Sequence, residues 1–146
     1  MAALREISVD DAAQIAFLST QLGYNLNVDE TTFQIKEVLS HPDHCAFVIA
    51  KEDKIIGWIH AFKTMRIESP PFVEIGGLVI DENHRGQGIG NKLVEKIKAW
   101  TLENNFSKVR VRCSTKRKEA HLFYNKIGFT ESKEQKIFEV SLEAGL

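Results

Sequence analysis

The sequence predicts an α+β protein whose strands and helices follow in the order β-α-α-β-β-β-α-β-α-β-β. Short apolar runs rich in β-branched residues indicate the strands, and apolar residues at three- and four-residue spacing indicate the helices. A strand, a glycine-rich loop and a helix follow one another without interruption over residues 78–93. The length of 146 residues is enough for one full hydrophobic core, so we expect a single domain spanning residues 1–146.

The composition argues against several classes of function. A net charge of −1 and a pI near 6.5 speak against a nucleic-acid partner, because neutralising phosphates needs clustered Lys and Arg. No apolar run approaches the length that spans a membrane, and the first residues lack the apolar core of a signal sequence. We therefore expect a cytoplasmic protein without a membrane partner. Cys45 and Cys113 lack paired spacing and are expected to be reduced core thiols.

The first element is expected to be a strand over residues 4–7, where apolar and polar residues alternate. Ser8, with Asp11 three residues later, has the spacing of a helix N-terminal cap. Apolar residues at helical spacing then predict a helix over residues 9–22, which ends at Gly23.

The second helix is expected to begin at Asp29, which can cap it, and to close before Pro42. Two apolar runs follow, at residues 45–50 and 55–62. The charged residues 51–54 join them. This pattern predicts an antiparallel hairpin.

A long strand is predicted over residues 72–80, with Gly76 and Gly77 in its interior. Glycine inside a strand usually marks a bulge or a close approach to the backbone. A helix over residues 88–104 and a strand over residues 108–113 follow.

The last part of the sequence predicts a helix over residues 117–127, stopped by Gly128. From Phe129 onward the chain is expected to form two strands connected through residues 133–135.

The loop after the long strand has the composition of an anion site. Gly86, Gly88 and Gly90 let the backbone curl so that several N–H groups face one point. The helix that follows adds its unpaired first-turn amides and its positive dipole end. Such a loop is suited to a phosphate, although a strand-to-helix turn without a ligand remains the alternative.

Two common phosphate loops do not fit this spacing. A Walker-type loop needs Gly-Lys followed by Ser or Thr, whereas Asn91 separates Gly90 from Lys92 here. A dinucleotide fingerprint beginning at Gly86 would require glycine at position 91.

The spacing Arg85-x-x-Gly88-x-Gly90 resembles the acetyl-CoA pyrophosphate loop of the GNAT superfamily of N-acetyltransferases. Residues 120–129 resemble the family's Ala-x-x-Phe-Tyr-x-x-x-Gly-Phe segment at the CoA thiol, and residues 21–24 are similar to a branch of bacterial small-molecule acetyltransferases. The resemblance covers nearly the whole chain. It implies a mixed, mostly antiparallel sheet of about seven strands flanked by four helices, with acetyl-CoA as co-substrate.

The resemblance also implies where acetyl-CoA binds. Exposed amides of the strand before the loop would hold the pantetheine and polarise the acetyl oxygen, and the loop amides would hold the pyrophosphate. Ser114 stands where family members often have an Asn or Ser after the fifth strand, and this position is compatible with a CoA contact. Lys116 could meet the 3′-phosphate or lie in a solvated loop, and Asn125 could bind CoA or cap locally. The expected cofactor-binding residues are Leu78, Val79, Ile80, Arg85, Gly86, Gln87, Gly88, Ile89, Gly90, Asn91, Ser114, Lys116 and Asn125.

Acetyl transfer to an amine needs a proton acceptor for the amine and a donor for the leaving thiolate. By the resemblance, Tyr124 is the general acid. A phenol of ordinary pKa about 10 is protonated at neutral pH, although a core aromatic is the alternative. Glu74, on the strand of the acetyl site, is the candidate base; a solvated edge carboxylate is equally compatible. His60, His84 and His121 are left unassigned as bases.

The acceptor is expected to be a primary amine of a small polar molecule, with a protein amine left open. Tyr24, Trp58 and His60 should border its pocket. A non-catalytic acyl-CoA-binding sensor or interaction module is the alternative function. The sequence has no ligand spacing that predicts a metal, and it is compatible with a homodimer formed through the terminal strands.

Overall fold

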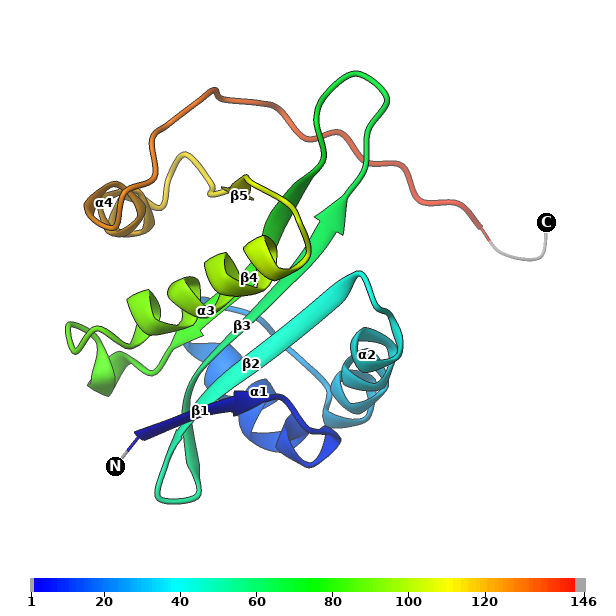
Figure 1. Ribbon diagram of the computed structural model, residues 1–146. Helices are drawn as coiled ribbons and strands as arrows, with labels where there is room; N and C mark the ends of the chain where they lie inside the picture. Colours follow the sequence, from blue (N-terminus) through cyan, green and yellow to red (C-terminus); the bar gives the residue numbers. More distant parts are fainter. Residues whose placement is uncertain (1, 144–146) are drawn as a thin grey trace. The chain divides into compact units, whose positions relative to one another are not determined.

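The computed structural model describes residues 2–143, which form two compact units that meet in sequence between Arg112 and Cys113. The strands are β1 (Ala2–Glu6), β2 (His44–Lys51), β3 (Lys54–Thr64), β4 (Phe72–Ile80) and β5 (Val109–Val111) (Figure 1). The α-helices are α1 (Ala12–Ser19), α2 (Val28–Ser40), α3 (Ile89–Glu103) and α4 (Lys118–Lys126), and α4 lies in the smaller unit. Short 3-10 helices cover Val9–Asp11, Thr20–Leu22 and Glu82–His84.

The larger unit is built on one sheet with the strand order β1-β2-β3-β4-β5. Neighbours from β1 to β4 are antiparallel, and β4 and β5 are parallel. The expected mixed, mostly antiparallel sheet and the four helices are therefore confirmed.

The expected number of strands is wrong, because residues 2–143 contain five strands and not about seven. The two strands predicted after Phe129 do not form, and residues 130–143 carry no regular secondary structure. Two short strands are marginal unless they bury an apolar face, and the apolar side chains of this segment, including Phe138 and Val140, are exposed.

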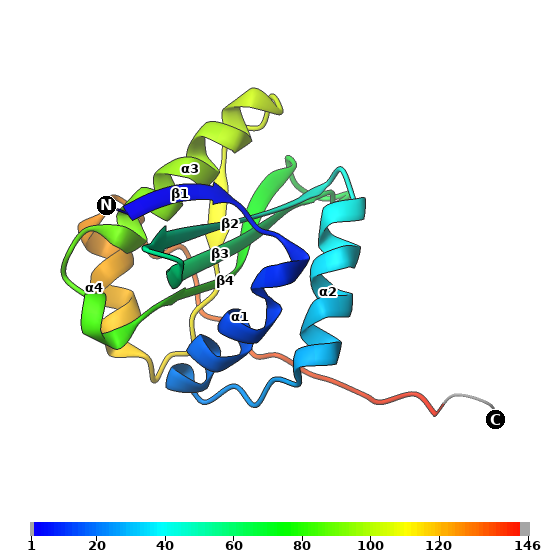
Figure 2. The ribbon, with the colours of Figure 1, turned by 90° about the horizontal axis from the view of Figure 1, so that it is seen from below.

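Helices cover both faces of the sheet in the larger unit. Figure 2 shows α3 along one face and α1 and α2 against the other. On the α1 and α2 side, Ile15 and Ile35 pack with the strand residues Val48, Ile55 and Val79. On the other side α3 comes close to β3 at Gly57, where an added Cβ would lie 3.2 Å from Ile89 and 3.3 Å from Leu93.

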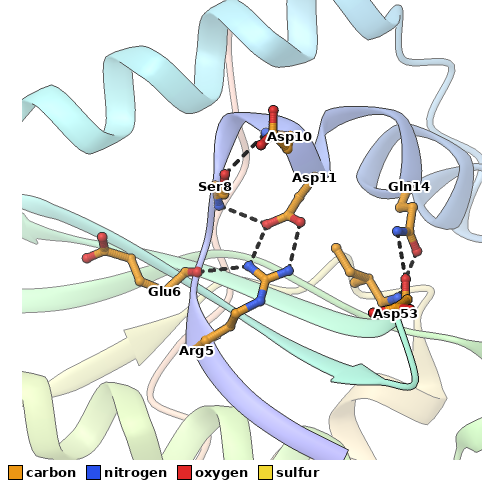
Figure 3. A network of polar contacts seen from close by, with 8 residues as sticks. Arg5, Glu6, Ser8, Asp10, Asp11, Gln14 and Asp53 are labelled. Atoms are coloured by element: carbon orange, nitrogen blue, oxygen red, sulfur yellow. Dashed lines mark hydrogen bonds and ion pairs between the residues drawn. The ribbon is translucent and has the colours of Figure 1, made fainter.

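The turn between β1 and α1 contains the expected helix cap. The Ser8 amide donates to Asp11 Oδ2 at 2.8 Å, and the Ser8 Oγ accepts from the Asp10 amide at 3.3 Å. Arg5 Nη1 and Nη2 each donate to the Asp11 carboxylate at 2.8 Å (Figure 3). The helical segment ends at Gly23 as expected, with a φ of 85°, although 3-10 turns form both of its ends.

The second helix begins earlier than expected, because its cap is Asn27 and not Asp29. The Asn27 Oδ1 accepts from the amides of Asp29 at 2.8 Å and Glu30 at 3.1 Å. Both acidic residues therefore lie in the first turn, where the helix dipole favours negative charge.

The remaining predictions for the larger unit hold with small shifts in the boundaries. The β2–β3 hairpin turns at Glu52 and Asp53, which have the positive φ values that suit a two-residue turn. The long strand coincides with β4, and α3 starts one residue after the predicted position. The fifth strand is shorter than predicted, at Val109–Val111.

Candidate functional site

A bulge interrupts β4 where the double glycine predicts an irregularity. His60 pairs with Gly77 and Ala61 pairs with Ile75, so Gly76 is an extra residue on β4. Both glycines also make room for side chains of β3. An added Cβ at Gly76 would lie 3.0 Å from His60 Nδ1, and one at Gly77 would lie 2.7 Å from the Trp58 ring. The bulge therefore brings the β4 backbone against these two rings.

Beyond this bulge β4 parts from β5. The parallel pairing covers Val73 to Ile75, opposite Val109 to Val111, and none of the residues 76–80 has a partner in β5. Among residues 2–143, the edge of β4 that faces β5 thus has no strand partner along the segment that includes Leu78, Val79 and Ile80. Such an edge can hydrogen-bond an extended ligand.

The loop after β4 ends in a helix N-terminus whose amides have no side-chain cap among the described residues. Gly86 and Gly88 both have a φ of 79°, and space is open where a Cβ would stand. Gly88 is the N-cap of α3. The free first-turn amides of α3 and its positive dipole end make this loop an anion cradle.

Asp81 anchors the start of the loop, and sequence reasoning missed this role. This buried carboxylate accepts from Gln21 Nε2 at 3.0 Å and from His84 Nδ1 at 2.8 Å, while Gln21 Oε1 accepts from the Glu82 amide at 2.8 Å. Burial alone would raise the pKa of Asp81, but these hydrogen bonds, first that of Gln21, outweigh it and lower the pKa. Gln21 and Asp81 are far apart in sequence, so no local pattern links them.

Two of the predicted acceptor residues meet at the end of α1. The Trp58 indole N–H donates to Ser19 Oγ at 3.2 Å, and the Tyr24 amide donates to the Ser19 carbonyl at 3.3 Å. The Tyr24 side chain is half exposed. Ser19 thus fixes both the polar edge of Trp58 and the backbone of Tyr24, whose exposed side chain can contact a ligand.

The third predicted acceptor residue, His60, lies on the same face of β3, two residues after Trp58. Its Nε2 is 2.9 Å from His44 Nδ1 on β2. Burial, with a smaller effect of His44, lowers the pKa of His60 to about 4, so its ring is neutral at physiological pH.

The candidate base Glu74 lies on β4 directly opposite Phe62 and therefore shares the sheet face of His60 and Trp58. Its Oε1 accepts from Arg112 Nε at 3.2 Å, and its side chain is only 16% exposed. The structure thus brings Glu74, His60 and Trp58 to one face along β3 and β4.

The candidate acid Tyr124 lies on α4 in the smaller unit. Its ring makes edge contacts with Phe123 and Phe129, at centroid distances of 5.0 and 5.4 Å. Burial is the main cause that raises the pKa of Tyr124, so the phenol is protonated at neutral pH.

The other predicted residues of the smaller unit are on its surface. Ser114, Lys116 and Asn125 are exposed. The Ser114 carbonyl is 2.8 Å from His121 Nε2, and its Oγ accepts from the Lys116 amide at 3.3 Å. These contacts fix the turn that leads into α4.

Two hollows lie on the larger unit, of about 500 and 230 Å³. The larger is lined by the β2–β3 turn and His84, and the smaller lies beside Gln21 and Asp81. Neither is lined by Tyr24, Trp58 or His60. Within residues 2–143 no helix is long and apolar enough to cross a membrane, and no group of three or more His, Cys, Asp or Glu is placed to hold a metal ion.

Several solved structures share this fold. Aminoglycoside 6′-N-acetyltransferase AAC(6′)-Ih from Acinetobacter baumannii aligns with a TM-score of 0.86 at 14% identity, over 98% of this chain and 100% of that one. Glucosamine-6-phosphate N-acetyltransferase from Arabidopsis thaliana aligns with a TM-score of 0.82 at 23% identity, over 97% and 99%. AAC(6′)-Iy bound to a bisubstrate analogue of CoA aligns with a TM-score of 0.85 at 16% identity, over 97% and 99%.

Curated relatives match this chain over a smaller part of their own length. N-acetylaspartate synthetase of Xenopus tropicalis is 28% identical over 91 residues, which are 62% of this chain and 32% of that protein. Human N-acetyltransferase 8B is 28% identical over 101 residues, which are 66% of this chain and 43% of that protein. The chain thus spans less than half the length of these relatives.

The sequence model of the acetyltransferase (GNAT) family matches residues 6–129. This match covers most of the chain and includes both the β4–α3 loop and the Tyr124 segment. The chain therefore belongs to the GNAT family of acetyltransferases.

Proposed function

We propose that this protein is an N-acetyltransferase that transfers acetyl directly from acetyl-CoA to a primary amine of a small polar acceptor. In this proposal residues 1–146 make one N-acetyltransferase domain that acts in the cytoplasm. The observation that carries it is the combination of an opened β4 edge with an uncapped helix N-terminus immediately after it. The extended pantetheine arm of CoA suits an open strand edge, and its diphosphate suits an anion cradle.

The backbone of Leu78, Val79 and Ile80 pairs with the pantetheine. The loop from Arg85 to Asn91 binds the pyrophosphate through its amides. Support for the loop comes from the two left-handed glycines, which leave space for phosphate oxygens to approach the backbone. In this proposal Ser114, Lys116 and Asn125 also contact CoA.

Two side chains carry the proton transfers in this proposal. Glu74 takes the first proton, which turns the ammonium of the acceptor into the free amine that attacks the thioester carbonyl. Tyr124 donates its phenolic proton to the departing CoA thiolate as the C–S bond breaks. Burial raises the pKa of Tyr124, so the phenol carries its proton at neutral pH and is available as a donor.

The acceptor pocket is bordered by Tyr24, Trp58 and His60, on the face of the sheet that carries α1. Ring faces with few charges suit a small amine held by stacking and a few hydrogen bonds. The names of the similar proteins support a small amine, because they refer to aminoglycosides and glucosamine 6-phosphate.

A panel of amines assayed for acetyl-CoA-dependent thiol release tests the proposal. We expect Tyr124→Phe to lower kcat on an accepted amine by about 10²-fold, the usual contribution of a general acid, while calorimetry finds acetyl-CoA affinity within about twofold of the unmodified protein. Leu122→Ala, at an exposed position on the same helix, is the control and should keep kcat.

Other outcomes would decide against this function. Acetyl-CoA binding without thiol release from any amine would favour the non-catalytic acyl-CoA sensor. The absence of binding by calorimetry would contradict both functions.

A further inference from the structure

The contact between His44 and His60 has no task in the proposed mechanism, in which His60 only borders the acceptor pocket. It joins the first residue of β2 to the middle of β3 through the 2.9 Å contact between His44 Nδ1 and His60 Nε2. The two ring planes are only 12° apart, and both rings pack on Phe62. Two imidazoles in this arrangement share one hydrogen between the facing nitrogens.

The other nitrogen of His60 faces the β4 bulge. An added Cβ at Gly76 would lie 3.0 Å from His60 Nδ1, so the missing side chain at Gly76 leaves this nitrogen beside the β4 backbone. The bulge lies two residues before Leu78, where the proposed function places the pantetheine of acetyl-CoA. The outer nitrogen of the pair therefore lies beside Gly76, two residues before the strand segment to which the proposed function assigns the pantetheine.

We propose that His60 and His44 form a proton relay that receives the proton lost by the acceptor amine when it attacks the thioester. The inference rests on the proposed function and adds a second proton acceptor to it. Glu74 removes the proton that makes the amine nucleophilic. His60 removes the one that leaves after the C–N bond has formed.

The proton steps balance within the pair. In the resting state His60 Nε2–H donates to His44 Nδ1, and His60 Nδ1 carries the free lone pair. As the amine nitrogen bonds to the carbonyl carbon, its proton moves to His60 Nδ1, the Nε2 proton moves to His44 Nδ1, and His44 Nε2 releases its proton to water. The thiolate takes its proton from Tyr124. The resulting phenolate then takes a proton from water, and the Glu74 carboxyl releases its proton to water. The pair returns to its first tautomer by proton exchange with water.

The relay suits a buried site because neither ring has to hold a positive charge. Burial lowers the pKa of both rings, that of His60 to about 4, so an isolated His60 would be a weak base. A concerted shift through two rings keeps both neutral. The charged or titratable groups near the pair are His41 and Asp43 beside His44, and the Glu74–Arg112 ion pair on the other side of Phe62.

Three variants test the relay with an accepted amine. We expect His60→Gln to lower kcat/KM at least tenfold at pH 7, with acetyl-CoA affinity unchanged by calorimetry. His44→Gln should lower kcat/KM about threefold or more. The double variant should have the same kcat/KM as His60→Gln, because the effects of residues that act as a unit are not additive. His41→Gln, an exposed neighbour outside the pair, should stay within about twofold.

The pH profile separates this role from that of Glu74 and from a structural role. The loss of kcat/KM in Glu74→Gln should become smaller as the pH approaches the pKa of the acceptor amine, because more of the amine then binds in its neutral form. The loss in His60→Gln should persist at that pH. For His60→Ala, added imidazole should restore part of kcat, whereas pyrrole, a ring of similar size without a basic nitrogen, should not.

Unchanged kcat/KM in His60→Gln, or equal recovery with imidazole and pyrrole, would overturn the relay and leave the acetyltransferase proposal intact. If the unmodified protein releases no thiol with any amine of the panel, both the relay and the acetyltransferase proposal are overturned.

Discussion

Gly23, Gly86 and Gly88 hold nearly the same left-handed backbone, with φ values of 85°, 79° and 79°, and each has open space at its Cβ position. An alanine Cβ at any of these positions would contact no neighbouring atom, so the substitution costs only the strain of the left-handed backbone. That cost is about 1 kcal/mol. The three sites differ in place: Gly23 ends a helical turn, whereas Gly86 and Gly88 belong to the anion cradle. Alanine substitutions at the three positions should therefore have a similar backbone cost, and only those at Gly86 and Gly88 should affect the anion cradle.

We expect Gly88→Ala to raise the Kd for acetyl-CoA about tenfold or more, because its methyl group would occupy the space that phosphate oxygens approach. Gly23→Ala should lose a similar free energy of unfolding, about 1 kcal/mol, and keep its Kd. Calorimetry with acetyl-CoA and urea unfolding measure the two quantities. Equal affinities in both variants would show that the loop does not bind the diphosphate.

At the scale of elements, the junction of β1 with α1 depends on one carboxylate. Asp11 is 5% exposed and accepts from Arg5 and from the Ser8 amide. Burial alone would raise the pKa of Asp11, but these hydrogen bonds and the nearby positive charge outweigh it and lower the pKa. A carboxyl whose pKa is lowered on folding stabilises the fold above its unfolded pKa of about 3.9, and this stabilisation is lost as the pH falls through the folded value.

Asp11→Asn should therefore lower the free energy of unfolding at pH 7 by about 1–2 kcal/mol, since Asn keeps the shape but not the charge-assisted bonds. We expect a loss at the low end of this range, because the half-exposed Arg5 is partly screened by solvent. The difference from the unmodified protein should be constant from pH 6 to 8 and shrink below pH 4. Urea unfolding across this range measures it, and Asp10→Asn in the same turn is the control. A difference that stays constant down to pH 3 would contradict the assignment.

Local signals predicted the elements well where they agreed with each other. Three such features depend only on a few neighbouring residues: the charged hairpin turn, the double glycine in β4 and the glycines before α3. The sequence pattern was therefore enough to predict them. The cap of α2 was misplaced because Asn27 and Asp29 are both good cap residues, and only the backbone conformation distinguishes them. The Gln21–Asp81 contact depends on chain folding over 60 residues and has no local signal.

At the scale of the whole molecule, the sequence pattern was wrong about the end of the chain. Phe138, Val140 and Leu142 alternate as in a strand with one apolar face, in the part of the chain where two strands were predicted. In the structure they belong to a segment without regular secondary structure, and their side chains are 89%, 83% and 88% exposed. Alternation shows that a segment can pair but does not identify its partner.

We expect this segment to pair with a strand edge of a second copy, because covering a row of three large apolar side chains at strand spacing is favourable. Burying them should contribute about 1.5–3 kcal/mol each. Phe138→Lys should therefore weaken self-association at least tenfold. Ser141→Lys adds the same charge on the opposite face of the segment and is the matched control. Sedimentation over a range of protein concentrations measures the association constant. A monomer at every concentration, or equal constants for the two variants, would contradict the pairing, and the apolar row would then need another cover.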